Sequence, residues 1–171
     1  ALAFMAKQKG LNPRILNDVV DVNYDRRRDV PKQVEKLLGG DLKGKTVGML
    51  GLAFKENTDD MRDAPSVDIS NALIAAGAKV RAYDPVAREA AAPHMPAVEI
   101  VSDVYEMAKG CDALVVVTPW NEFKQIDLEK MKGLLKSPVI YDGRNIYDPA
   151  RMYEMGFTYR AIGRPSQNGR A

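Results

Sequence analysis

Apolar and polar residues alternate with two different periods along this chain, and the longest regular pattern comes first. Within residues 14–38 the apolar side chains recur at spacings of three and four, and the clearest are Ile15, Val19, Val22, Val30, Val34 and Leu37. This spacing predicts one long amphipathic helix with a charged opposite face. Pro31 either kinks that helix or starts a second one that Asp29 would cap.

After this helix, short apolar runs that predict strands alternate with segments that predict helices. Strands are expected at 45–50, 79–83, 98–101, 112–117, 137–141 and 157–160, and helices at 67–76, 87–92, 103–108, 127–135 and 149–155. The run DALVVV at 112–117 is typical of a central parallel strand covered on both faces. The alternation predicts an α/β fold with a Rossmann-like, doubly wound parallel sheet of five or six strands, preceded by the long helix.

Polar motifs follow the carboxyl ends of several predicted strands, where doubly wound sheets bind ligands. Lys55 follows a turn ahead of a helix N-terminus, so it is placed to meet a diphosphate as a point charge. Arg144 follows another strand and can clamp a phosphate or carboxylate with two parallel hydrogen bonds. The alternative for Lys55 is an ordinary surface lysine, and the alternative for Arg144 is a structural ion pair. Asp142 either orients Arg144 or only forms a turn.

The first of these motifs carries a family resemblance. Residues 51–66 read GLAFKENTDDMRDAPS, which resembles the signature that opens the UDP-binding domain of the UDP-glucose/GDP-mannose dehydrogenase family. Glu56 departs from the pattern, since a proline is common there, and this solvent-side change should matter little. The resemblance extends more weakly from Ala1 to about Gly163. Because the chain opens without Met inside a predicted helix, we expect it to be a piece of a longer protein.

The resemblance implies an activity and a set of site residues. Members of this family use NAD to oxidise the C6 alcohol of a nucleotide sugar to a carboxylate, and UDP-glucose is the favoured substrate here. GDP-mannose, a UDP-N-acetyl sugar and a non-catalytic nucleotide-binding module are the alternatives. Phe54, Lys55 and Arg144 would contact the UDP-sugar, and Arg62 would reach toward NAD. The N-terminal domain that binds most of NAD, and the family's cysteine nucleophile, would precede Ala1, so no catalytic residue is expected in this piece.

The resemblance also implies a division of the chain. Residues 1–40 would be a helical connector from the dimerisation region, 41–163 the UDP-sugar-binding domain, and 164–171 a disordered tail. The apolar stripe of helix 14–38 predicts a homo-oligomer, since it would otherwise face water. Arg26, Arg27 and Arg28 lie in the middle of this helix. A solvated helix face is the favoured interpretation of these arginines, and a phosphate-binding patch is the alternative.

Three further residues could carry chemistry. Asp84 follows the strand 79–83 and could hold a ribose hydroxyl, but a turn or helix cap is favoured because no GxGxxG motif accompanies it. Cys111 enters a buried strand with no neighbouring His or Lys pattern to lower its pKa, so a packing role is expected. His94 has no metal-binding partner in its surroundings, and no metal site is expected.

Composition narrows the class of protein. The 171 residues include 25 basic and 23 acidic side chains, a net charge of +2, with 46% hydrophobic residues. This balance suits a soluble globular protein and gives no support to nucleic-acid or membrane binding. No apolar run approaches the roughly 20 residues that span a bilayer. The single cysteine excludes an internal disulfide and suits a reducing compartment, so a cytoplasmic location is expected.

Overall fold

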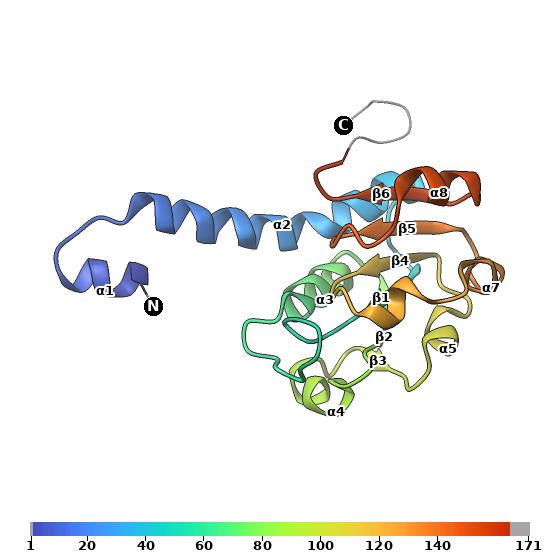
Figure 1. The fold of residues 1–171 in the computed structure, drawn as a ribbon, viewed down its shortest axis with the longest axis horizontal. Coiled ribbons are helices and arrows are strands. Elements are labelled where there is room, and N and C mark those ends of the chain that lie inside the picture. The colour runs from blue at the N-terminus through green and yellow to red at the C-terminus, as the bar shows by residue number, and fades with distance from the viewer. Residues whose placement is uncertain (1, 165–171) are drawn as a thin grey trace.

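The structure, a computed structural model, describes residues 2–164, and these contain one parallel six-stranded sheet (Figure 1). The strands are β1 (Thr46–Leu50), β2 (Lys79–Tyr83), β3 (Glu99–Ile100), β4 (Ala113–Val116), β5 (Val139–Asp142) and β6 (Thr158–Ala161). Their order across the sheet is β3-β2-β1-β4-β5-β6. This is the order of doubly wound nucleotide-binding folds, so the predicted fold class is confirmed. Of the predicted tail, residues 165–171 lie outside the described residues.

Helices precede the sheet and connect its strands. They are α1 (Leu2–Gln8), α2 (Arg14–Leu38), α3 (Pro65–Ala75), α4 (Arg88–Ala91), the 3-10 helix η1 (Ala92–His94), α5 (Val104–Ala108), α6 (Asn121–Lys124), α7 (Leu128–Leu134) and α8 (Pro149–Glu154). The sequence pattern missed α6, because four residues are too few to show a helical period. Asp103, within the helix predicted at 103–108, is the N-cap of α5, and its carboxylate accepts the N–H groups of Tyr105 and Glu106.

Helices cover both faces of the sheet, and β4 shows this most clearly. Ala113 and Val115 belong to a hydrophobic cluster that includes residues of α2 and α3. Leu114 and Val116 belong to a second cluster, on the face covered by α5, α7 and α8. All four side chains are buried, as expected for a central parallel strand.

The long helix α2 has two different halves. It continues through Pro31, so no second helix starts there, and near its C-terminal end Val30 and Val34 are buried in the first cluster. Its N-terminal half extends away from the sheet (Figure 1), and there Ile15 and Val19 expose 79% and 53% of their surface. One end of α2 therefore completes the core of the sheet domain, while the other carries an apolar stripe in solvent. None of the helices within residues 2–164 combines the length and the apolar character that crossing a bilayer requires.

Candidate functional site

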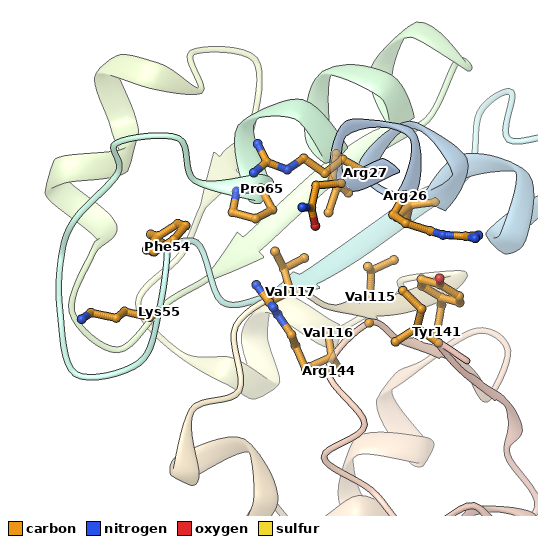
Figure 2. A pocket seen from close by; sticks show the side chains of 15 residues that line it. Arg26, Arg27, Phe54, Lys55, Pro65, Val115, Val116, Val117, Tyr141 and Arg144 are labelled. Carbon is orange, nitrogen blue, oxygen red and sulfur yellow. The ribbon is translucent and has the colours of Figure 1, made fainter. Parts of the chain in front are cut away.

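A cleft of about 450 Å³ lies at the carboxyl edge of the sheet, between α2, the start of α3 and the ends of β4 and β5 (Figure 2). Phe54 and Lys55 line it from the β1–α3 loop, and Arg144 lines it from the β5–α8 loop. The structure therefore brings together the three residues that were predicted to bind substrate. The rest of the lining comes from α2, α3 and the strand ends and includes Asn23, Arg26, Arg27, Val30, Pro65, Ile69, Val115, Val116, Val117 and Tyr141.

Asp84 fixes the turn from which Phe54 and Lys55 emerge. One oxygen, Oδ2, accepts hydrogen bonds from the backbone N–H groups of Leu52 and Ala53 at 2.7 and 3.1 Å, and from the Trp120 indole at 3.1 Å. The other oxygen accepts two backbone N–H groups of the turn after β2. Asp84 thus has five donors and only 3% of its surface exposed, so neither oxygen is left for a ribose hydroxyl. This agrees with the favoured interpretation of Asp84 as a turn residue.

Gly51 allows the loop after β4 to approach this turn. Its φ of 92° is one that side-chain-bearing residues rarely adopt, and a Cβ there would lie 2.4 Å from the Cβ of Thr118. The Thr118 hydroxyl in turn donates to the carbonyl of Ala53 at 2.7 Å. The exit from β1 is thus held by contacts with both neighbouring strand ends, which fixes where Phe54 begins.

The β1–α3 loop closes on itself beyond Lys55. The Phe54 N–H donates to the carbonyl of Asp60 at 2.8 Å. The Asp60 carboxylate accepts from Nε and Nη2 of Arg62 at 2.9 and 2.8 Å, and this hydrogen bonding lowers the pKa of Asp60 to about 2. The Arg62 side chain is 90% exposed and is not among the cleft residues. The residue predicted to reach NAD is therefore separate from the predicted substrate residues.

Arg144 is held by its own strand end and by the end of β4. Its Nε donates to the carbonyl of Val117 at 2.5 Å. Asp142 is fully buried and accepts the Arg144 backbone N–H at 2.8 Å, so it shapes the loop and does not orient the guanidinium. Burial lowers the pKa of Arg144, yet arginine keeps its charge in proteins. Within residues 2–164 its two terminal nitrogens have no hydrogen-bond partner, so they remain available to an anion.

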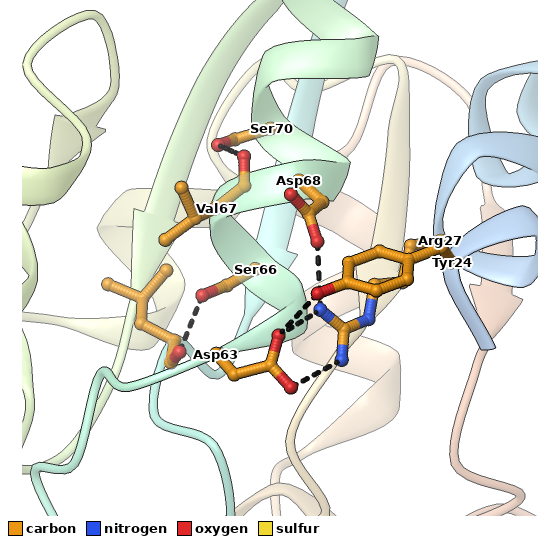
Figure 3. A network of polar contacts seen from close by, with 8 residues as sticks. Tyr24, Arg27, Asp63, Ser66, Val67, Asp68 and Ser70 are labelled. Carbon is orange, nitrogen blue, oxygen red and sulfur yellow. Dashed lines mark hydrogen bonds and ion pairs between the residues drawn. The ribbon is translucent and has the colours of Figure 1, made fainter. Parts of the chain in front are cut away.

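Helix α2 places Arg27 at the border of the cleft, which the sequence interpretation missed. Arg27 is only 12% exposed in its side chain and forms ion pairs with Asp63 and Asp68 (Figure 3). The favoured interpretation of this arginine as part of a solvated face is therefore wrong. The available signal was spacing: Arg27 precedes the buried Val30 and Val34 by three and seven residues, which puts it on the buried face of the helix.

The charge around the cleft is suited to an anion. Lys55, Arg144 and Arg26 of α2 all line it, and within the described residues none of the three forms an ion pair. Arg27 is also cationic, but two carboxylates compensate it. Aliphatic side chains of β4 and the ring of Phe54 supply apolar surface beside these charges (Figure 2). A ligand with a flat ring and a diphosphate matches this combination.

The turn after β1 does not fit a dinucleotide such as NAD. In dinucleotide-binding folds this turn offers its backbone N–H groups to the pyrophosphate, and the following helix begins at once. Here the N–H groups of Leu52 and Ala53 are bound to Asp84, and α3 begins only at Pro65. These residues therefore provide no pyrophosphate site of the dinucleotide kind.

Cys111 and His94 are not among the residues that line the cleft. Cys111 is fully buried, its thiol donates to the Met107 carbonyl at 3.1 Å, and burial raises its pKa to about 11. This confirms the predicted packing role, because a nucleophilic cysteine needs a lowered pKa. His94 lies in η1, and no group of three or more metal-binding side chains occurs among residues 2–164.

Comparison with known proteins gives consistent matches. The family model described as "UDP-glucose/GDP-mannose dehydrogenase family, UDP binding domain" matches residues 48–149. The UDP-glucose 6-dehydrogenase of Rhizobium meliloti is 41% identical over 96% of this chain, and the Bacillus subtilis UDP-glucose 6-dehydrogenase TuaD is 43% identical over 99%. The chain spans only 38% and 37% of these relatives. A solved UDP-glucose dehydrogenase from Pyrobaculum islandicum superposes with a TM-score of 0.75 at 31% identity, over 85% of this chain and 32% of that one.

Proposed function

The chain belongs to the UDP-glucose/GDP-mannose dehydrogenase family, and we propose that its cleft binds the uridine diphosphate part of a nucleotide sugar. The observation that carries this proposal is the convergence of Phe54, Lys55 and Arg144. They come from two loops some 90 residues apart and line one cleft at the carboxyl edge of a parallel sheet. That edge is where folds of this kind bind nucleotides.

Each of the three residues has a distinct role in this proposal. Lys55 meets the diphosphate as a point charge, and the terminal nitrogens of Arg144 meet it with directed hydrogen bonds. Each such contact contributes about 1.5–3 kcal/mol when well formed. Phe54, with 43% of its surface exposed, offers a flat apolar face to the nucleoside. We expect binding to the 171-residue chain on the order of millimolar, or about −4 kcal/mol, because other parts of the site would lie outside it.

We further propose that the chain is the C-terminal portion of an NAD-dependent nucleotide-sugar 6-dehydrogenase, with UDP-glucose as substrate. The support is the similarity along nearly the whole chain to proteins of that name. Another nucleotide sugar is the alternative substrate. NAD would be held mainly by a separate domain, which agrees with the poor fit of the β1–α3 turn, and the exposed Arg62 would reach toward it. The buried thiol of the single cysteine favours a reducing, cytoplasmic setting.

We also propose that residues 1–40 act as a connector and that the chain self-associates through α2. Ile15, Val19 and Val22 expose an apolar stripe that a second copy would cover. Sedimentation at tens of micromolar should reveal an oligomer, and Val19→Asp should shift it toward monomer. Asn17→Asp adds the same charge on another side of the helix and should have little effect. A monomer at that concentration without any substitution would contradict the proposal.

The direct test of the UDP site is a titration of the chain with UDP, followed by NMR. Lys55→Ala and Arg144→Ala should each abolish detectable binding. Lys79→Ala, at the amino end of β2, and Arg151→Ala, on the exposed side of α8, remove the same charges away from the cleft and should leave the affinity unchanged. Equal affinities for all four variants would refute the assignment.

A further inference from the structure

Arg27 joins the long helix to the substrate loop. Its Nη1 donates to Asp63 Oδ1 at 2.9 Å and to Asp68 Oδ2 at 2.8 Å, and its Nη2 donates to Asp63 Oδ2 at 3.4 Å (Figure 3). Asp63 ends the β1–α3 loop, and Asp68 lies in the first turn of α3. One guanidinium therefore ties together three segments that border the cleft.

Two side chains of α2 hold the β1–α3 loop at Asp63. Asp63 has a φ of 55°, a left-handed conformation that is uncommon for residues other than glycine, although aspartate adopts it more readily than most. Tyr24, one turn before Arg27 on α2, adds a hydroxyl bond to Asp63 at 3.4 Å and places its ring 4.8 Å from the guanidinium. Both contacts come from α2, and they add to the local turn that the Ala64 N–H closes on the Met61 carbonyl at 3.2 Å.

Asp63 is linked to the part of the same loop that carries Phe54 and Lys55. Asp63 is three residues after Asp60, whose carbonyl accepts the Phe54 N–H. The direction in which Phe54 and Lys55 leave the turn therefore depends on residues 60–63, the part of the loop that leads back to α3. Arg27 itself lines the cleft, but its charge is already matched by two carboxylates, so it has little left to offer a phosphate.

We propose that Arg27 is a positioning residue for the nucleotide site, acting through Asp63 to hold the loop that presents Phe54 and Lys55. This inference rests on the proposed function of the cleft. It also makes UDP affinity depend on α2, the helix whose other half carries the exposed apolar stripe.

A double-mutant cycle on the 171-residue chain tests the proposal. Arg27→Met removes the guanidinium and keeps most of the aliphatic stem, while Asp63→Asn removes the charge with a residue that tolerates positive φ. Each should weaken UDP binding about tenfold, and the double variant should be no weaker than either single variant. Arg27→Lys should recover part of the affinity. Arg28→Met, the neighbouring exposed arginine, should change nothing.

Amide hydrogen exchange without UDP supplies a second readout. Arg27→Met should speed exchange of the Phe54 N–H while the amides of β1 and β4 keep their protection, because only the loop is released. If Arg27→Met does not fold, Asp63→Asn carries the same test. Additive losses of affinity would mean that Arg27 contacts UDP itself, and unchanged affinity would mean that it only stabilises the fold; either result overturns the proposal. An unaltered chain that fails to bind UDP would instead contradict the proposed function first.

Discussion

Replacing Asp84 with Asn should destabilise the chain far more than the loss of one charge suggests. Both carboxylate oxygens of Asp84 are used, one by three N–H donors and the other by two. Asparagine has only one carbonyl oxygen, and its amide would point N–H groups at donors. In the better of its two orientations, the oxygen serves the three donors from Leu52, Ala53 and Trp120, and two backbone N–H groups lose their acceptor.

The magnitude follows from those two groups. A buried N–H without a partner costs about 1–3 kcal/mol, which applies in full to the buried Ala87 N–H, while the part-buried Val86 N–H costs less. Asp84→Asn should therefore lower the free energy of unfolding by about 2–4 kcal/mol. That is a large share of the roughly 5–15 kcal/mol that stabilises an ordinary domain.

Urea unfolding at neutral pH, without any ligand, measures this effect. Asp103→Asn is the matched control, because both N–H groups that Asp103 caps bond to the same oxygen, which asparagine retains. The control should change the free energy of unfolding by only a few tenths of a kcal/mol. If Asp84→Asn cost no more than Asp103→Asn, Asp84 would not be holding the turn, and a ligand-binding role would have to be reconsidered.

Other consequences can be checked separately. Gly51→Ala should lower the free energy of unfolding by about 2 kcal/mol or more, because of its positive φ and the clash with Thr118. In the same urea experiment Gly133→Ala should raise the free energy of unfolding by about 0.5–1 kcal/mol, because Gly133 lies inside α7 with open space around it. Cys111 should resist thiol reagents at pH 8 in the native chain and react readily in urea, since its pKa is raised to about 11; equal rates would contradict its burial. The 171-residue chain should not reduce NAD when given UDP-glucose, which absorbance at 340 nm would show, and any turnover would contradict the proposal that it is only part of the enzyme.

Local pattern was enough to predict most of the fold. The apolar run of β4 and the helical spacing of α2 each depend on residues close together in sequence, and both predictions were confirmed. Phe54, Lys55 and Arg144 could be expected at one edge because parallel strands place all their carboxyl ends there. What the pattern could not reveal was which distant residues α2 contacts in the core and in the cleft.

The missed features depend on contacts between distant segments. Arg27 lies 36 and 41 residues from its two carboxylate partners, so no local motif connects them. Asp84 was correctly favoured as a turn residue, but three of its five donors lie 31 to 36 residues away in both directions. Arg62 shows the opposite case, since its partner is only two residues away and its side chain is nearly fully exposed.

The central claim is that the cleft bordered by Phe54, Lys55 and Arg144 receives UDP, and amide chemical-shift mapping tests it most directly. Titrating UDP into the ¹⁵N-labelled chain should shift the amides of the β1–α3 and β5–α8 loops and those at the carboxyl ends of β4 and β5. The amides at the amino ends of the strands, around Lys79 and Ala113, should stay unchanged. Shifts concentrated at those amino ends, or absent from both loops, would contradict the account.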